Sequence, residues 1–445
     1  MKSSTGTPTH PGTSDLGSLR ARMNELIPGG CHTYAKGDDQ FPVNAPAFID
    51  RGDGCHSWDP SGRRFLEFGM GLRAVTLGHA FKPVVEAVRQ SLDLGTNFSR
   101  PSRLELECAE TFLGIVRTAE MVKFCKDGSH AVDGAIRLAR AHTGRDCVAV
   151  CADHPFFSTS DWFIGTTQMN SGIPQATRQL AIPFKYNDSD SLRSVFEQHP
   201  GRIACVIMEP ARIDEPSPGY LERVKGLCHA GGALLVFDEM ITGFRWNLRG
   251  AQYEYGVTPD LSTFGKAMAN GFSVSALAGR RDVMRLGGNA HDRERVFLLS
   301  TTHGAETHQL AAAIATMRFY ESHPVIETLA ARGARLRVGV ERAIRDAGVE
   351  GHVGLISRDC NLLYFTRGPD MQPSQDFRTL LLQELIRGDV IAPSFVVSYS
   401  HSEEDIDRAI DVTASALRVY RRALDEGIAK HLEGRPVKPV FRRFS

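Results

Sequence analysis

The alternation of apolar and polar positions divides the chain into a central part and two flanking parts. Between about residues 105 and 320, stretches with helical spacing of apolar residues alternate with short apolar runs such as CVAV, CVIM and LLVF. Apolar runs of this length, bounded by turn residues, are typical of strands that are buried on both faces. Because strands and helices alternate, the central part predicts an α/β domain with a mainly parallel sheet between helices.

The flanking parts predict a smaller α+β domain that is built from both ends of the chain. Residues 46–68 read as a β-meander with turn signals such as Asp53-Gly54. Residues 327–344 form a long charged helix, which a strand pair and two further helices follow. We expect a disordered polar tail (1–18), an N-terminal segment of the small domain (19–75), a large domain (76–322) and a C-terminal part of the small domain (323–445).

Composition excludes several classes of partner. Lys plus Arg and Asp plus Glu both total 52, which gives no electrostatic case for binding nucleic acid or an acidic membrane surface. No apolar run approaches the roughly 18–20 residues of a transmembrane helix, and the polar N-terminus lacks the apolar core of a signal peptide. Nine scattered cysteines without a CxxC pair indicate reduced thiols in a cytoplasmic protein, and we expect no metal site.

The strongest candidate chemistry lies at Asp238 and Lys266. Asp238 ends the apolar run 234–237, and open α/β sheets place their sites at the carboxyl ends of strands. Lys266 stands in the small-residue stretch KAMANGFSVSALAG, where a desolvated amine loses its proton and attacks a carbonyl. Pyridoxal 5'-phosphate (PLP) needs such a pair, because the lysine carries its aldehyde and the carboxylate keeps its ring nitrogen protonated. On spacing alone, an ordinary buried strand and a surface lysine explain these residues equally well.

Weaker signals stand at other strand ends. Gly128-Ser129 opens a helix directly after a strand, which suits either a phosphate at the backbone N–H groups or a plain serine cap. Phe156 follows the strand DCVAVCA and either stacks on a flat ring or belongs to the core. Thr302 lies in a hydroxyl-rich turn after the apolar run VFLLS. Their placement at successive strand ends indicates one shared site more strongly than any of them does alone.

The sequence also resembles a known family, in which residues at these places belong to one site. The segment ALLVFDEMITGFRWNLRGAQYEYGVTPDLSTFGKAMANGFSVSALAGR resembles the class III, fold-type I, PLP-dependent aminotransferases, especially the branch of glutamate-1-semialdehyde 2,1-aminomutase. GSHAVDGAIRLARAHTGRD resembles the phosphate-binding helix of that family, and the PGG near residue 28 and the APS and HSEEDID near the C-terminus also match. The resemblance covers about residues 20–425. It implies a large domain with a mainly parallel seven-stranded sheet between helices, and a small α+β domain.

The resemblance implies roles for the residues around the cofactor ring. Lys266 forms a Schiff base with PLP and later moves a proton between the substrate and the cofactor. Asp238 pairs with the pyridinium nitrogen. Phe156 takes the place of a ring-stacking tyrosine in the family, and Met240 packs on the opposite ring face.

The resemblance also implies a phosphate site that two subunits share. Gly128, Ser129 and the amide of His130 would hold the phosphate from one subunit. Thr302 would reach it from the partner subunit, so the protein is expected to be a homodimer. His130 replaces a glutamate of the family and adds a titratable group at this place.

The loop that follows PGG departs from the aminomutases. In those enzymes a serine and an arginine at this place grip the substrate carboxylate, and Thr33 and Lys36 stand there in this chain. A lysine cannot make the bidentate contact of an arginine. Asp38 and Asp39 follow directly, which suits a cationic substrate. We therefore expect Tyr34, Lys36, Asp38 and Asp39 to contact the substrate.

These features favour an aminotransferase that takes nitrogen from glutamate or glutamine. Its acceptor would be the carbonyl of a polar, amine-bearing small molecule, such as an oxidised amino sugar of aminoglycoside antibiotic biosynthesis. An aminomutase reaction within one semialdehyde stays open, as does racemisation or epimerisation by the same lysine. A non-catalytic scaffold is a further alternative, against which the intact Lys266 and Asp238 speak.

Overall fold

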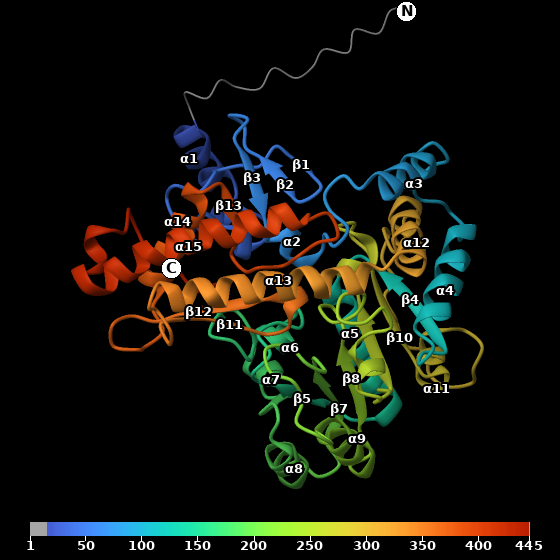
Figure 1. Cartoon of the computed structure of the whole chain (residues 1–445). Coiled ribbons are helices and arrows are strands. Elements are labelled where there is room, and N and C mark those ends of the chain that lie inside the picture. The colour runs from blue at the N-terminus through green and yellow to red at the C-terminus, as the bar shows by residue number, and fades with distance from the viewer. Residues whose placement is uncertain (1–15, 445) are drawn as a thin grey trace, which may run out of the picture.

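The structure, a computed structural model, describes residues 16–444 (Figure 1). Most of the expected tail, residues 1–15, therefore lies outside the described residues. The expected end of the tail at residue 18 is wrong, because helix α1 (Leu16–Leu26) already begins at residue 16. No helix in the described part is long and apolar enough to cross a membrane.

The large domain contains a seven-stranded sheet with the strand order β4-β10-β9-β8-β7-β5-β6. The strands are β4 (Met121–Cys125), β5 (Cys147–Cys151), β6 (Ala181–Phe184), β7 (Ile203–Met208), β8 (Leu234–Asp238), β9 (Leu261–Phe264) and β10 (Ser275–Gly279). Neighbours are parallel from β9 to β6, whereas β10 is antiparallel to both β4 and β9. The predicted mainly parallel seven-stranded sheet is confirmed. Every residue of β5, β7, β8, β9 and β10 is buried, which explains their unbroken apolar runs.

Helices surround this sheet. The helical elements of this part are α3 (Lys82–Leu92), α4 (Arg103–Ile115), α5 (Gly128–Thr143), α6 (Asp161–Ile164), α7 (Gln175–Arg178), α8 (Ser189–Gln198), α9 (Tyr220–Ala230), α10 (Ala251–Glu254), η5 (Lys266–Ala269), α11 (Arg281–Met284), η6 (Arg285–Gly287) and α12 (Thr307–Ser322). On one face, Phe112 of α4 packs edge-on against Phe264 of β9 with ring centres 5.3 Å apart. On the other face, α5 lies so close that a Cβ at Gly134 would stand 3.0 Å from Leu277. Both faces of the sheet are therefore buried under helices.

Segments from both ends of the chain share a second sheet of four strands. Its order is β1-β2-β3-β13, with β1 (Arg51–Asp53), β2 (His56–Trp58) and β3 (Arg64–Glu67) antiparallel and β13 (Val390–Ile391) parallel to β3. The other elements are η2 (Pro28–Gly30), η3 (Tyr34–Lys36), η4 (Asp38–Gln40), α2 (Met70–Arg73), α13 (Val325–Asp346), β11 (Val353–Ile356), η7 (Asp359–Asn361), β12 (Leu363–Thr366), α14 (Gln375–Arg387), α15 (Glu403–Glu426) and η8 (Ile428–Lys430). Strands β11 and β12 form an antiparallel pair, as the sequence predicts.

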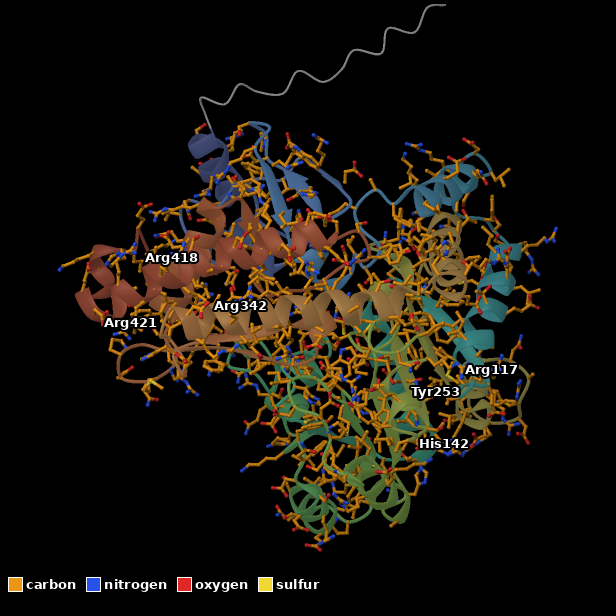
Figure 2. All side chains as sticks on the ribbon, in the orientation of Figure 1. Arg117, His142, Tyr253, Arg342, Arg418 and Arg421 are labelled. Carbon is orange, nitrogen blue, oxygen red and sulfur yellow. The ribbon has the colours of Figure 1, made fainter. Side chains whose placement is uncertain are left out.

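Helices α13 and α15 are amphipathic and pack on each other (Figure 1). Leu417 and Tyr420 of α15 are buried, whereas Arg418 and Arg421 on the same helix and Arg342 on α13 are exposed (Figure 2). Residues with helical spacing thus divide between a buried apolar face and a charged outer face.

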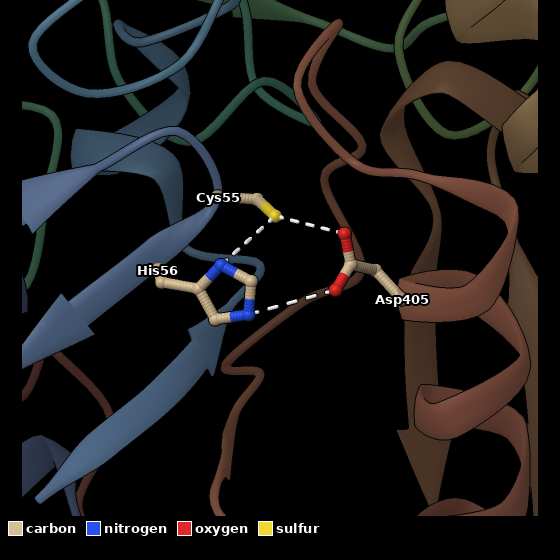
Figure 3. Close-up of side chains that lie close together, drawn as sticks. All are labelled: Cys55, His56 and Asp405. Atoms are coloured by element: carbon tan, nitrogen blue, oxygen red, sulfur yellow. Dashed lines mark hydrogen bonds and ion pairs between the residues drawn. The ribbon is translucent and has the colours of Figure 1, made fainter.

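A polar cluster joins β2 to the start of α15 (Figure 3). The Cys55 thiol donates to Asp405 Oδ2 at 3.3 Å, and Cys55 Sγ lies 3.5 Å from His56 Nδ1. His56 Nε2 lies 3.5 Å from Asp405 Oδ1, and Asp405 also forms the capping box of α15 with Ser402. Burial raises the pKa of Cys55 strongly, so the thiol keeps the proton that it donates. Side chains of these three types can bind metal ions, and the spacing of the cysteines in the sequence did not predict that they would meet. The contacts of Cys55, His56 and Asp405 are those of a hydrogen-bonded junction between two segments.

Candidate active site

Three ionisable side chains lie at the carboxyl ends of neighbouring strands, at one edge of the large sheet. Asp238 is the last residue of β8, Glu209 comes directly after β7, and Lys266 comes two residues after β9. These strands are adjacent and parallel, so their carboxyl ends meet at the same edge. The structure thus brings Asp238 and Lys266 together, as the sequence predicts.

Asp238 is a buried carboxyl group of which one oxygen, Oδ1, accepts hydrogen bonds. It is 3% exposed, and its Oδ1 accepts hydrogen bonds from the Met240 N–H at 2.9 Å and from Thr263 Oγ1 at 3.3 Å. Burial and the nearby Glu209 carboxylate raise the pKa of Asp238 to about 7, against the effect of Lys266. A cationic N–H partner would favour the ionised carboxylate at this place.

Lys266 begins the short helix η5 in a left-handed conformation with φ +48°. Burial lowers its pKa, and Arg73 and Arg212 lower it further, whereas Asp238 and Glu209 act in the opposite direction. A lowered pKa leaves more of the amine unprotonated, which is the form that attacks a carbonyl.

Two glycines make room for Met240 between Lys266 and the start of α5. A Cβ at Gly265 would stand 2.8 Å from Met240 Sδ and 2.5 Å from Ser275 Oγ. A Cβ at Gly128 would stand 3.0 Å from the same sulfur atom. The Met240 sulfur therefore lies between Gly265, next to Lys266, and the start of α5. The contact of Met240 with a cofactor ring stays a prediction.

The N-terminus of α5 is capped by a residue that sequence analysis did not select. Asp127 is the N-cap, and its Oδ1 accepts the His130 N–H at 3.0 Å. The plain serine cap is therefore wrong, and the His130 amide donates to the cap instead of being open for a phosphate. Ser129 Oγ accepts the Thr159 N–H at 3.1 Å. Phosphate binding by Gly128 and Ser129 stays a prediction, and the helix start is the kind of place where anions bind.

Phe156 and Thr302 are accessible. The ring of Phe156 is 44% exposed and packs edge-on against Phe163, with ring centres 5.7 Å apart. One face of the ring can therefore meet a ligand. Thr302 is exposed, and its carbonyl accepts a hydrogen bond from Asn97 Nδ2 at 3.0 Å. Its contact with a phosphate of the partner subunit stays a prediction.

The two acidic residues of the N-terminal loop are engaged with arginines of the same chain. Asp38 pairs with Arg20 at 3.2 Å and with Arg435 at 2.6 Å. Asp39 pairs with Arg442 at 2.5 Å. These guanidinium groups compensate both carboxylates within the chain. The contact of Asp38 and Asp39 with a cationic substrate stays a prediction.

A polar cavity of about 940 Å³ lies beside this loop. It is lined by parts of the N-terminal loop, of the segment 168–171 and of the C-terminal segment, including Tyr34, Asp38, Asp39, Asn170, Arg435 and Arg442. Tyr34 is 56% exposed, and Lys36 is exposed too. Lys266 and Asp238 are not among the residues that line this cavity, so a direct role for the loop residues at the lysine stays a prediction.

Glu209 also lies at this edge of the sheet, and like Asp238 it stands at the carboxyl end of a buried strand, although its sequence context carries no further signal that singles it out. Glu209 follows the run CVIM, is 5% exposed, and donates its backbone N–H to His154 Nδ1 at 3.0 Å. Its Oε2 accepts no hydrogen bond from the described residues and lies 3.8 Å from Arg212 Nε. Burial raises the pKa of Glu209, and the neighbouring Arg212 and Lys266 oppose that rise.

These groups fit a flat cationic ring that carries an aldehyde and an anionic tail. Asp238 offers an acceptor for a ring N–H, Lys266 offers an amine for the aldehyde, and the start of α5 suits the anion. The Met240 sulfur lies against Gly265, the residue before the lysine, and against Gly128 at the helix start. PLP has all three chemical features.

Comparisons with known proteins agree with this chemistry. A family model described as aminotransferase class III matches residues 34–353. Proteins named glutamate-1-semialdehyde 2,1-aminomutase from Syntrophobacter fumaroxidans and Thermomicrobium roseum are each 33% identical to this chain. The first alignment covers 88% of this chain and 94% of the relative, and the second covers 91% and 98%.

Two solved structures have the same fold as this chain. The FumI protein of Sphingopyxis sp. MTA144, in its PLP internal aldimine form, is 28% identical with a TM-score of 0.83, and the match covers 93% of this chain and 98% of that one. An omega-transaminase from Sphaerobacter thermophilus is 26% identical with a TM-score of 0.84, and the match covers 92% and 98%.

Proposed function

Because this chain belongs to the class III aminotransferases, which depend on PLP, we propose that it transfers an amino group between two separate substrates. The donor is glutamate or glutamine. The acceptor is the carbonyl of a polar small molecule, for which an oxidised amino sugar of the aminoglycoside type is the specific candidate. The enzyme acts as a homodimer in which Thr302 of each subunit completes the other subunit's phosphate site.

The observation that carries this proposal is the loop after PGG. Thr33 and Lys36 stand where the aminomutases have a serine and an arginine for the substrate carboxylate, and both are exposed. The adjacent cavity of about 940 Å³ offers carboxylate, guanidinium, amide and phenol groups. Such a lining suits a molecule with several hydroxyl and amino groups better than a small aliphatic semialdehyde.

The residues at the sheet edge divide the work of the reaction. PLP, when bound, supplies an electron sink and a carbon that carries the amino group. The Asp238 carboxylate accepts the ring N–H, and that cation keeps the carboxylate ionised although burial raises its pKa. Lys266 Nζ would hold the aldehyde carbon until the substrate amine displaces it. The freed Lys266 amine would then be the base that takes the proton from the substrate α-carbon and returns it. Phe156 covers the exposed ring face and excludes water.

A second candidate function is the aminomutase reaction. It is favoured by the names of the two relatives that are 33% identical over about nine-tenths of this chain. In that reaction one semialdehyde exchanges its amino group between two carbons and needs no separate donor.

Absorbance spectra of the holoenzyme distinguish the two functions. We expect glutamate or glutamine to convert the cofactor to its amine form, and an oxidised amino sugar to restore the original spectrum. Conversion by glutamate semialdehyde or its diamine, with no response to glutamate, glutamine or amino sugars, would establish the aminomutase instead. A change of substrate configuration without cofactor conversion would indicate a racemase or epimerase.

A further inference from the structure

We propose that Arg73 and Arg212 form the binding site for the carboxylate of the amino-acid substrate. This inference rests on the proposed aminotransferase function and names the part of the site that recognises the donor. The N-terminal loop, where the aminomutases hold a carboxylate, has no arginine at the matching place.

Both arginines are fixed by the same short segment of the small domain. Arg73 Nε donates to Asn361 Oδ1 at 2.8 Å, and the hydroxyl of Ser357 donates to the Arg212 carbonyl at 2.6 Å. Arg73 Nη2 also donates to Ser394 Oγ at 3.2 Å. Residues that lie 139 positions apart in the sequence (73 and 212) are thus brought to one junction between the two domains. Ligand sites occur preferentially at such junctions.

The segment that follows Arg73 packs against the loop that follows Lys266. Asn270 Oδ1 accepts the N–H groups of Thr76 at 3.0 Å and of Leu77 at 2.8 Å. Both arginines also lower the pKa of Lys266. Arg212 Nε lies 3.8 Å from Glu209 Oε2, and Glu209 is itself in electrostatic contact with Lys266. A carboxylate held there would therefore bring the amino group of an amino acid close to Lys266.

Cationic side chains outnumber carboxylates around Arg73 and Arg212. Burial, Arg212 and Arg245 lower the pKa of Arg73 to about 10, and Glu209 is the carboxylate that opposes them. Asp238, the other carboxylate that acts on Lys266, pairs with the cofactor ring in the proposed reaction. A bound anion would compensate the remaining cations.

The guanidinium groups are also available to a ligand. The Arg212 side chain is 18% exposed, and among the described residues it has a polar side-chain partner only in Glu209, at a distance too long for a good hydrogen bond. Arg73 is partly exposed as well. Two guanidinium groups with unused N–H donors match the two oxygens of a carboxylate.

Binding of glutarate to the holoenzyme tests the proposal. Glutarate has the carbon chain and both carboxylates of glutamate but no amino group, so calorimetry reports binding without turnover. We expect Arg212→Gln and Arg73→Lys each to weaken glutarate binding about tenfold or more, since each loses charge-assisted hydrogen bonds. The matched control is Arg193→Gln on α8, an exposed arginine paired with Asp190, which should bind glutarate as the parent does.

The half-reaction separates this proposal from the proposed function. The half-reaction is measured in Arg212→Lys and Arg73→Lys, which keep both positive charges near Lys266. The KM for glutamate should rise about tenfold or more in each, whereas the KM for an amino sugar without a carboxylate should rise by less than that. If Arg212→Gln proves unstable, Arg212→Lys also replaces it in the glutarate measurement, because lysine keeps the charge and loses only the bidentate contact.

Unchanged glutarate affinity in the variants, or no glutarate binding to the parent enzyme, would overturn the carboxylate site. The aminotransferase proposal would survive that result if glutamate still converts the parent cofactor. If glutamate does not convert the cofactor of the parent enzyme but glutarate binding is still lost in the variants, glutamate is not the donor. The carboxylate site would then be supported by the binding data alone.

Discussion

Replacing Gly265 with alanine tests the packing that positions Lys266. The added Cβ would stand 2.5 Å from Ser275 Oγ and 2.8 Å from Met240 Sδ, both closer than real Cβ contacts. The backbone at Gly265 is extended (φ −178°, ψ −148°), so the contacts decide the outcome. Both neighbours must therefore move by more than about half an ångström for normal van der Waals contact.

The cost follows from what surrounds these neighbours. Met240 is 8% exposed and also lies 3.0 Å from the place of a Cβ at Gly128, so it has little room to retreat. Overpacking of a buried site costs about 1–3 kcal/mol. We expect Gly265→Ala to lower the free energy of unfolding by that amount and, because Met240 shifts at the site, to weaken cofactor binding about tenfold.

Urea unfolding and dissociation of the cofactor, followed by absorbance, measure the two effects. The matched control is Gly226→Ala in the middle of α9, where an added Cβ meets nothing within 4 Å. That variant should be as stable as the parent or more stable by up to about 1 kcal/mol, because alanine favours a helix interior over glycine.

A double variant identifies the responsible contact. Ser275→Ala removes the nearer atom, so the Gly265→Ala/Ser275→Ala protein should regain part of the lost stability. The reasoning is refuted if Gly265→Ala alone unfolds at the same urea concentration as the parent and keeps its cofactor equally well.

Three further perturbations address the cofactor site, the start of α15 and two buried histidines. Asp238→Asn should slow the half-reaction by roughly two orders of magnitude, which is the scale for losing one preorganised charge partner. Single-turnover absorbance measures this rate, and a rate equal to that of the parent would contradict the role of Asp238 as partner of the ring nitrogen. Asp405→Asn removes the anionic acceptor of the Cys55 thiol and should lower the free energy of unfolding by about 1–3 kcal/mol, which an unchanged urea midpoint would disprove. Burial lowers the pKa of His154 and of His401 from 6.5 to about 3, so below pH 6.5 the unfolded chain takes up protons that the folded chain does not. Stability should therefore fall between pH 6.5 and pH 3 by up to about 1.4 kcal/mol per pH unit for each histidine, and His154→Gln should flatten this slope in urea unfolding at pH 7.5 and pH 5.5.

The sequence by itself determined the sheet and the pair at its edge. Unbroken apolar runs identify strands that are buried on both faces, and alternation with helices makes most of them parallel. Asp238 and Lys266 were predictable because the carboxyl ends of adjacent parallel strands converge whatever the packing elsewhere. Glu209 obeys the same rule, because it follows the buried strand β7, so the sequence contains enough information to place it at this edge.

Tertiary structure decided which charges are free. Asp38 and Asp39 look like open acidic groups in the sequence, and Arg435 and Arg442 compensate them from about 400 residues away. The electrostatic effect of Arg73 on Lys266 equally depends on distant segments, because Asn361 and Ser394 hold the Arg73 guanidinium group. Periodicity and strand ends are properties of short segments, whereas the partner of a charged side chain depends on how distant segments pack.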